Sequence, residues 1–581
     1  MEATIFLDSF RGVFGALKKN WIVFASFIVG LPVLYLSITG PLDAYHEGAI
    51  FPPGVAVANG LTIYSEVNHQ YGFVHIYINA LFFKIFGSYL VVYRMIGLIL
   101  LLANSYLLYK ILWKFISKNQ AQILAISTLM ISPTWSIINS NELGTVGPWP
   151  NVYGITFTLL SILFWWKALN DNYPFIWSSL SGFASALAVG VRIQFLLVVI
   201  LQISLLIYLF WRRRLRSNLL VTWFAGAATG FILLISFLSI QGALNDAYEQ
   251  LIVVWTMEAP NSPKIGGQDL LRTLLLFFFF VGTSMLLASG KRCFKLPMGQ
   301  IIALTSLGVL YFMINFTSFF NSWPEKIAKA AIHSLGQVLF SVAIFLTLSF
   351  LYSLFKDLIP RNQSISPDFS VEDRGFFFFV ISICMGMFAQ FHNLNSNYLW
   401  MCIHPFLVWF VLRFKPFAEG KFRSKPWAAV NNFIVFAIIA SLSLSLAKID
   451  FSRFAYSTEM LKGVQEHEKW KRDLVDENFE FIRSLNAEGK IRLDCSAGLY
   501  SVDEDGYILD SKWTWNEIPF EWRKANIESA IPGHLVLACN EGGPWTAIYK
   551  SLVAQGSLEV VKSNDSFTAY RVKKKPKVLT Y

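Results

Sequence analysis

Two carboxylates and an imidazole are concentrated in a short segment that follows the first long apolar run. Asp43, His46 and Glu47 come directly after the uncharged stretch Trp21 to Gly40. A low-dielectric region beside a carboxylate raises its pKa, which suits the carboxylate to accept a proton from a reacting group. Asp43 and Glu47 share one face if the segment is helical. Both can also be ordinary solvated acids beside a helix end, and the pattern leaves the two interpretations open.

The chain that must position these groups consists mainly of apolar runs. Hydrophobic residues make up 55% of its 581 residues and charged residues only 15%, a balance that is wrong for an ordinary globular protein. Runs such as Ser217 to Gly242 and Gly375 to Phe391 are long enough to cross ~30 Å of hydrocarbon as helices. We count about thirteen of them. The predicted fold is therefore a polytopic α-helical membrane protein.

The basic residues lie in short loops between these runs and give the chain an orientation. Although the net charge is +11, clusters of this kind orient membrane helices, which argues against a nucleic-acid partner. Basic loops are expected to be cytoplasmic, and the neutral or acidic loops between them face outward. The predicted cytoplasmic loops are Arg11 to Lys19, Lys110 to Lys118, Arg212 to Arg216, Lys291 to Lys295, Lys356 to Arg361 and Arg413 to Lys425. The predicted outer segments are Asp43 to Gln70, Asn139 to Asn151, the turn at Arg192, Ala243 to Gln268, Phe319 to His333 and Asn393 to Asn397.

The last part of the chain has a different character. Residues 1–449 form the predicted transmembrane domain, and residues 450–581 have more charge and shorter apolar runs. Strands are predicted at Ile491 to Leu493, Leu535 to Ala538 and Leu558 to Val561, with helices at Glu466 to Leu485 and Trp545 to Ala554. The tail is thus predicted to be a small α/β domain on the extracytoplasmic side. Cys495 and Cys539 form a disulfide bond if the tail is exported, and two buried thiols are the alternative.

An ordered series of motifs runs through the first outer loop, residues 41–87, and into the next apolar helix. Its members are Glu47-Gly48, Gly60, Tyr71-Gly72, Phe86-Gly87 at the end of an amphipathic stretch, and Arg94. This order resembles the GT-C superfamily of membrane glycosyltransferases, which use polyprenyl-phosphate sugars. The resemblance covers about residues 1 to 200, where Trp149 to Gly154 and Val191 to Gln194 also look like family features.

The chain departs from the family pattern at two points. Phe73 replaces an expected proline, and His46-Glu47 stands where many members have an Asp-Glu pair, with Asp43 upstream. The resemblance implies one catalytic carboxylate in this loop. The two departures leave its identity open between Asp43 and Glu47.

The resemblance implies an inverting glycosyltransferase that moves a sugar from a polyprenyl-phosphate carrier to a glycan, lipid or protein acceptor at the outer face of the membrane. A lipid phosphate is a good leaving group, so one carboxylate acting as general base on the acceptor hydroxyl is sufficient. An inverting glycosidase needs two separated carboxyls to activate water and protonate a poor leaving group. The implied location is the inner (plasma) membrane, with many membrane passes and a periplasmic or extracellular tail.

Polar and cationic residues in the outer segments are the candidates for binding the substrate. Arg192 is the first candidate for the departing phosphate, because an arginine on the outer side is out of place under the positive-inside rule; the alternative is a snorkelling helix end. Lys264 lies in a Gly-containing loop that can order over substrate or remain solvated. The remaining predicted substrate-binding residues are His46, His69, Tyr71, His392, Asn395 and Tyr398, the last three in a turn that can also be a plain helix cap.

Metal dependence and the class of function each leave alternatives. His46, His69 and His75 can surround a divalent cation such as Mg²⁺ or Mn²⁺, and Glu142 can supply a further ligand, but no recognised ligand spacing is present. A cofactor-free enzyme is the other interpretation. The competing functions are a transporter or flippase of lipid-linked glycans and a non-catalytic membrane scaffold. Charges are nearly absent from mid-helix positions, which favours chemistry at the membrane surface over transport.

Overall fold

The structure is a computed structural model. It describes residues 47–113, 147–211, 215–253, 527–540 and 544–578, with isolated residues and short stretches between these ranges. In this part of the chain, four helices are long and apolar enough to cross a membrane, namely α5 (Leu90–Leu112), α7 (Pro150–Asn170), α8 (Pro174–Val191) and α10 (Ser217–Ile240). The other predicted membrane segments lie outside the described residues.

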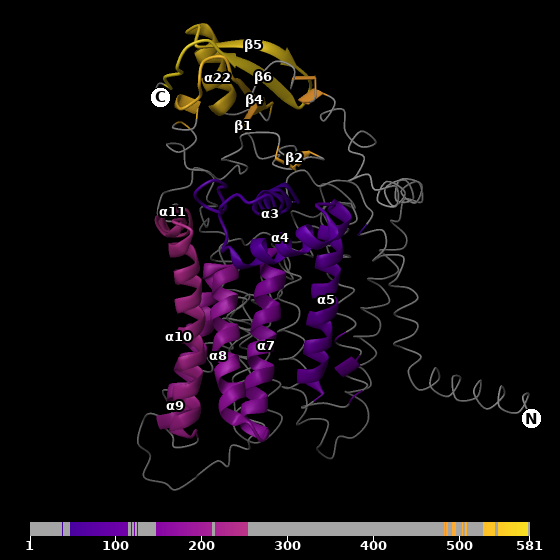
Figure 1. Ribbon diagram of the computed structural model, residues 1–581, viewed down its shortest axis with the longest axis vertical. Coiled ribbons are helices and arrows are strands. Elements are labelled where there is room, and N and C mark those ends of the chain that lie inside the picture. The colour runs from indigo at the N-terminus through magenta and orange to yellow at the C-terminus, as the bar shows by residue number, and fades with distance from the viewer. Residues whose placement is uncertain are drawn as a thin grey trace, which may run out of the picture.

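The membrane helices lie side by side in the order α5, α7, α8 and α10 (Figure 1). The shorter apolar helix α9 (Leu196–Trp211) connects α8 to α10, after the single turn η2 (Ile193–Phe195). Helices α3 (Phe51–Ala58) and α4 (Val74–Phe86) lie across one end of the bundle, and α11 (Leu244–Tyr248) lies at this same end (Figure 1). The short turn η1 (Glu47–Ala49) precedes α3, and the π-helical segment η3 (Glu249–Val253) follows α11. We call this end of the bundle the α3–α4 end.

Backbone-to-backbone contact holds α8 against α10. A Cβ atom added at Gly226 would lie 1.9 Å from the Ser179 carbonyl oxygen, and one at Gly182 would lie 2.1 Å from the Trp223 carbonyl oxygen. Gly226 and Gly230 form a G-x-x-x-G pair, the small-residue spacing that lets membrane helices approach closely. The absence of side chains at these positions therefore sets the separation of the two helices.

Replacing Gly226 with Leu is expected to destabilise the bundle by at least about 3 kcal/mol, the upper part of the usual range for overpacking, because backbone atoms would have to move. Thermal unfolding of the protein in detergent measures the change. Ala228→Leu is the matched control, since Ala228 is exposed on the same helix. Equal unfolding temperatures for Gly226→Leu and the wild type would contradict this account of the α8–α10 contact.

Neutral polar side chains are bonded to one another inside the bundle. The Ser161 hydroxyl group lies 2.8 Å from that of Ser185, and the Ser185 hydroxyl donates to Gln202 Oε1 at 2.6 Å. Trp223 Nε1 donates to the Ser181 hydroxyl oxygen at 3.2 Å. These residues come from α7, α8, α9 and α10 and carry no charge. The cluster joins the four helices in the way that polar residues stabilise membrane bundles.

The described part of the tail contains a mixed sheet. Four strands lie in the order β1 (Ile491–Asp494), β4 (Leu535–Cys539), β6 (Phe567–Val572) and β5 (Leu558–Ser563); β1 and β4 are parallel and the other pairs antiparallel. A separate hairpin pairs β2 (Val502–Asp503) with β3 (Gly506–Tyr507). Helix α22 (Pro544–Ala554) packs on the sheet through Ile548, Tyr549 and Leu552. Strands β1, β4 and β5 fall on the three segments whose short apolar runs predicted strands.

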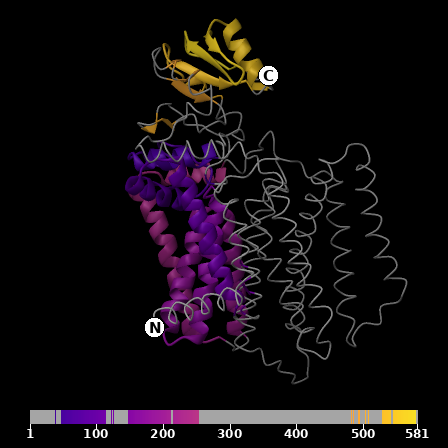
Figure 2. The ribbon, with the colours of Figure 1, turned by 90° about the vertical axis from the view of Figure 1, so that its right-hand side faces the viewer.

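The sheet lies beyond the α3–α4 end of the bundle in both views (Figures 1 and 2). The hairpin strand β3 contacts α3, so the described tail and the first loop are on the same side of the membrane helices. Cys539, at the end of the central strand β4, is disulfide-bonded. Cys539 is therefore a disulfide cysteine and not a buried free thiol. Cys495, its predicted partner, lies outside the described residues.

Candidate functional site

The carboxylate of Glu47 is bound by the guanidinium group of Arg94. Glu47 opens η1 and Arg94 lies in the second turn of α5. Arg94 Nε donates to Glu47 Oε1 at 2.6 Å, and Arg94 Nη2 donates to Glu47 Oε2 at 2.7 Å. Arg94 Nη1 donates to the Ile38 carbonyl oxygen at 2.9 Å. Both charged side chains are buried. Through these hydrogen bonds Arg94 of α5 is connected to Glu47 and to the backbone of Ile38.

This geometry bears on which acid could act as a base. Two parallel N–H donors engage both Glu47 oxygens in the bidentate form that is the strongest arrangement of this pair. A carboxylate held in this way has both oxygens engaged and would have to leave its partner to reach an acceptor hydroxyl group. Glu47 is therefore suited to hold structure in place and is poorly suited to be a general base.

Two buried histidines meet where the loop between α3 and α4 joins α4. We call residues 61–72 the 61–72 loop. His69 Nε2, from this loop, lies 3.3 Å from His75 Nε2, on the first turn of α4. Burial lowers the pKa of His69 to about 3. Burial, and then the nearby His69 and Arg192, lower the pKa of His75 well below its usual value. Both imidazoles are thus neutral at neutral pH, when each can donate one hydrogen bond and accept another.

A buried cation lies beside this pair. Arg192 follows the last residue of α8, and its side chain is 8% exposed. Its guanidinium group donates to Asn151 Oδ1 at 2.6 Å and to Gln194 Oε1 at 2.9 Å, and its carbon lies 5.0 Å from the centre of the Tyr71 ring. Both amide oxygens are neutral acceptors, and they orient the guanidinium group. An oriented cation at the end of a membrane bundle is a suitable partner for an anionic group.

The Tyr71-Gly72 turn requires glycine because it lies against the backbone of α8. A Cβ atom at Gly72 would lie 2.1 Å from the Gly190 carbonyl oxygen. This contact brings Tyr71 beside Arg192, which is two residues after Gly190. The aromatic-Gly motif therefore works by close approach to α8.

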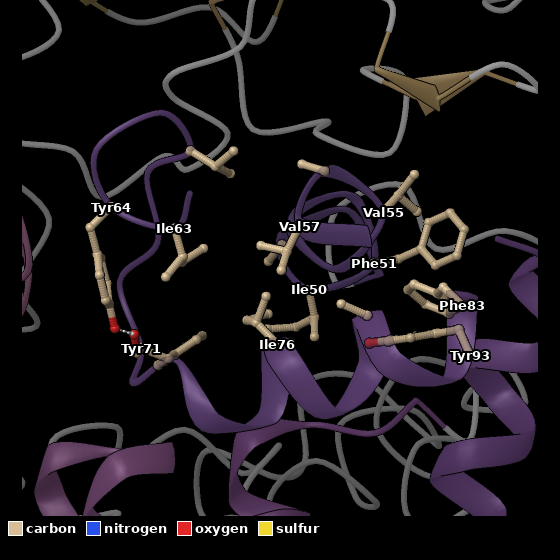
Figure 3. Packing of buried hydrophobic residues seen from close by; sticks show 14 of the residues in the cluster. Ile50, Phe51, Val55, Val57, Ile63, Tyr64, Tyr71, Ile76, Phe83 and Tyr93 are labelled. Atoms are coloured by element: carbon tan, nitrogen blue, oxygen red, sulfur yellow. Dashed lines mark hydrogen bonds between the residues drawn. The ribbon is translucent and has the colours of Figure 1, made fainter. Parts of the chain in front are cut away.

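The 61–72 loop also stores backbone strain. Tyr64 has a φ of 71°, a left-handed conformation that costs a residue other than glycine about 1–3 kcal/mol. Its hydroxyl group donates to the Tyr71 carbonyl oxygen at 2.6 Å, and its amide donates to the Val67 carbonyl oxygen at 2.7 Å (Figure 3). Ile63, Tyr64 and Tyr71 belong to the same buried cluster as α3 residues such as Phe51 and Val55 (Figure 3). The 61–72 loop is thus held both by hydrogen bonds between its own residues and by hydrophobic packing against α3.

The structure brings some of the predicted site residues to the α3–α4 end. His69, Tyr71 and Arg192 lie together there, with Glu47 paired to Arg94 at the start of α5. The other predicted residues lie outside the described part of the chain, namely Asp43, His46, Glu142, Lys264, His392, Asn395 and Tyr398. No group of three or more His, Cys, Asp or Glu residues that could hold a metal ion occurs among the described residues.

Gln250 and Asn79 were not identified from the sequence, whereas Tyr153 lies in the stretch Trp149 to Gly154 that resembles a family feature. Gln250 bonds to the 61–72 loop, and Tyr153 donates to Asn79 Oδ1 at 2.5 Å between α7 and α4. An amide side chain is a weak signal on its own. Asn151, which bonds to Arg192, directly follows Trp149-Pro150 in the sequence. Proline often marks the first turn of a helix, so this pair indicates that Asn151 lies at the start of α7.

Comparison with known proteins gives a partial match. The family model described as dolichyl-phosphate-mannose-protein mannosyltransferase matches residues 70–240. A comparison with curated proteins found no match.

Solved structures with distant similarity include ArnT from Cupriavidus metallidurans in the apo state, with 11% identity, coverage of 95% of this chain and 98% of that chain, and a TM-score of 0.40. The same ArnT bound to undecaprenyl phosphate gives 11% identity, the same coverage and a TM-score of 0.39. Archaeal oligosaccharyltransferase AglB from Archaeoglobus fulgidus, in complex with an inhibitory peptide and a dolichol-phosphate, gives 13% identity, coverage of 93% and 72%, and a TM-score of 0.40.

The match to the family model runs from the Tyr71-Gly72 turn to the end of α10 and contains Arg94, Asn151 and Arg192. Over residues 70–240 the chain is similar to the dolichyl-phosphate-mannose-protein mannosyltransferases, and this similarity confirms the resemblance to GT-C membrane glycosyltransferases without identifying a member.

Proposed function

We propose that the protein is an inverting glycosyltransferase that transfers a sugar from a polyprenyl-phosphate carrier to a glycan, lipid or protein acceptor at the outer face of the membrane. The family model supports a lipid-phosphate sugar donor, because the family description names dolichyl-phosphate-mannose. The observation that carries the proposal is the buried Arg192 at the α3–α4 end, bound by two neutral amide oxygens and stacked near Tyr71. It supplies a fixed positive charge where a lipid phosphate would depart.

In the proposed reaction Asp43 is the general base. Of the two candidate bases, Asp43 and Glu47, we assign Asp43, because both oxygens of the Glu47 carboxylate are bonded to Arg94. The acceptor hydroxyl group loses its proton to Asp43 while its oxygen attacks the anomeric carbon. The bond from that carbon to the phosphate oxygen breaks, and the lipid phosphate leaves with the electron pair beside Arg192. Attack opposite the leaving group inverts the anomeric centre.

Two observations support the placement of this chemistry outside the cytoplasm. Cys539 is disulfide-bonded, and disulfides persist in oxidising compartments. The sheet that contains Cys539 lies beyond the same end of the bundle as the 61–72 loop (Figure 2). We therefore propose a multi-pass protein of the inner (plasma) membrane, with residues 450–581 on the periplasmic or extracellular side.

The neutral Ser–Gln–Trp cluster inside the bundle bears on the transporter alternative. Transport sites usually contain buried charges or broken helices near the midplane of the membrane. The cluster of Ser161, Ser181, Ser185, Gln202 and Trp223 inside the described bundle is uncharged, and its members bond to one another. This arrangement favours a packing role and leaves surface chemistry as the better proposal.

The experiment that tests the function is transfer of radiolabelled sugar by purified protein. A panel of polyprenyl-phosphate sugars is offered as donors, with a native membrane extract as acceptor. Transfer of label from one donor to an extract component is expected. An EDTA arm decides between metal-free transfer and dependence on Mg²⁺ or Mn²⁺. Absence of transfer across the panel, with movement of lipid-linked glycan across vesicles, would instead support a flippase.

Replacing Arg192 with Met is expected to raise the KM for the donor by about 10- to 100-fold, because a hydrogen bond to a charged group contributes about 1.5–3 kcal/mol. Arg192→Lys keeps the charge without the planar fork and should be intermediate. Steady-state kinetics with varied donor measures the change. Arg216→Met is the control, since Arg216 is exposed and precedes α10 at the other end of the bundle. An unchanged donor KM in Arg192→Met would contradict the assigned role.

A further inference from the structure

Gln250 bridges two backbone positions of the 61–72 loop. Its Oε1 accepts a hydrogen bond from the His69 amide at 2.9 Å, and its Nε2 donates to the Tyr64 carbonyl oxygen at 2.8 Å. The Gln250 side chain is 8% exposed, and both hydrogen bonds are buried. The partners are 181 and 186 residues away in the sequence, so this contact joins the segment after α10 to the loop before α4.

The chemistry of the bridge is specific for a carboxamide of this length. One end of the Gln250 side chain presents an acceptor to an N–H group, and the other presents a donor to a C=O group, as a neighbouring peptide would in a sheet. A carboxylate can meet only the first partner and places a second oxygen against the Tyr64 carbonyl. An apolar side chain meets neither. A buried backbone group that loses its partner is costly, so the loop conformation depends on this amide.

The bridge acts on the residue that the loop holds under strain. Tyr64, whose φ is 71°, gives its carbonyl oxygen to Gln250 and its hydroxyl group to the Tyr71 carbonyl oxygen. The other bridged position, His69, contacts both His75 and Tyr71 through its ring. His69 and Tyr71, which are both assigned to the substrate site, therefore lie in a loop that is hydrogen-bonded to Gln250, a residue of another segment.

The segment that carries Gln250 is itself firmly attached to this end of the bundle. Phe237 of α10 stacks on Phe73, and Gln241 accepts a hydrogen bond from the Tyr77 hydroxyl group at 2.5 Å. Gln250 lies in the π-helical turn η3, a type of turn found frequently at functional sites. Ala247 of α11 is buried in the hydrophobic cluster that contains Tyr64, and Leu251 of η3 packs against it, so the segment with Gln250 lies anchored beside the loop.

We propose that Gln250 is a positioning residue of the substrate site, which holds the 61–72 loop so that His69 and Tyr71 face the sugar donor beside Arg192. This proposal rests on the proposed glycosyl transfer for its kinetic consequence. The structural consequence can be measured without any activity. Loss of the amide should loosen the loop while the membrane helices remain packed.

The first measurement is hydrogen exchange of the full-length protein in detergent, read by mass spectrometry on peptides covering 61–72. Gln250→Met removes both hydrogen bonds at similar length, and Gln250→Glu keeps the acceptor while losing the donor. Exchange in this loop should be at least tenfold faster in Gln250→Met, with peptides of α7 and α8 unchanged. Gln202→Met is the matched control, because Gln202 is a buried, hydrogen-bonded glutamine of α9. Wild-type exchange in the loop of Gln250→Met would overturn the proposal.

The second measurement is the kinetics of sugar transfer by the same variants. A misplaced site is expected to lower kcat by about 10- to 100-fold, with Gln250→Glu between the wild type and Gln250→Met. Faster loop exchange with an unchanged kcat and donor KM would overturn the positioning role. If the wild type transfers no sugar but the loop still loosens in Gln250→Met, the proposed function fails while the attachment of the loop by Gln250 stands.

Discussion

Asp43→Asn is expected to lower sugar transfer by about 10²- to 10⁴-fold, the usual contribution of a general base. The amide keeps the size of the side chain and its hydrogen-bonding capacity but cannot take the proton of the acceptor hydroxyl group. The effect should appear in kcat, with a donor KM close to that of the wild type, because the proposed mechanism assigns binding of the lipid phosphate to Arg192. Single-turnover transfer of radiolabelled sugar measures it directly.

Asp171→Asn is the matched control for this prediction, because Asp171 is exposed in the turn between α7 and α8 at the far end of the bundle. His46→Gln tests the neighbouring residue that stands where many GT-C members have aspartate. Full activity of Asp43→Asn would exclude Asp43 as the base. If His46→Gln alone lost transfer while remaining folded, the His46 imidazole would be assigned as the general base.

Glu47→Gln is expected to destabilise the protein by about 3–5 kcal/mol, because it removes a carboxylate that is bonded twice to the buried guanidinium group of Arg94. Arg94→Met should have an effect of similar size by stranding the Glu47 carboxylate. The two side chains are 1% and 0% exposed, so solvent screens neither charge. Thermal unfolding in detergent should show both single variants melting well below the wild type. Their transfer activity should be compared only at temperatures at which each variant is folded.

The double variant Glu47→Leu/Arg94→Met removes both charges and should recover part of the lost stability, since a buried pair replaced by apolar groups is often tolerated. Glu559→Gln is the control, because Glu559 and its partner Lys573 are each 52% exposed. An exposed pair of this kind is expected to leave the unfolding temperature unchanged. Wild-type stability in Glu47→Gln, or a double variant less stable than the two single losses combined, would contradict the role of the ion pair.

Much of the described membrane fold was predictable because lipid restricts spanning segments to regular helices. The stretch ending in Phe86-Gly87 is the helix α4, and Gly87 follows it with a φ of 89°. Helices α5, α7, α8 and α10 agree with long apolar runs of low charge in the sequence. Which helices touch was not predictable, because the close approach of α8 and α10 depends on Gly182 and Gly226, two small residues in separate runs.

The candidate site was only partly predictable for the same reason. Glu47, Arg94 and the Tyr71-Gly72 turn belong to an ordered motif series, so their types and order identified them. The pairing of Glu47 with Arg94, and the contact of Gly72 with Gly190, are long-range and give no local signal. Gln250 was missed because nothing in its own surroundings in the sequence shows that it bonds to a loop more than 180 residues away.

The buried ion pair also has a consequence for how the chain enters the membrane during synthesis. An arginine near the start of a membrane helix is costly to transfer into lipid, by about 2.5–3.5 kcal/mol at the helix centre and less near the end. The counter-charge of Arg94 comes from Glu47, which emerges from the ribosome earlier, and Arg94 also bonds to the Ile38 carbonyl oxygen. Insertion of α5 therefore gains most when Glu47 and Ile38 are already in place to bond Arg94.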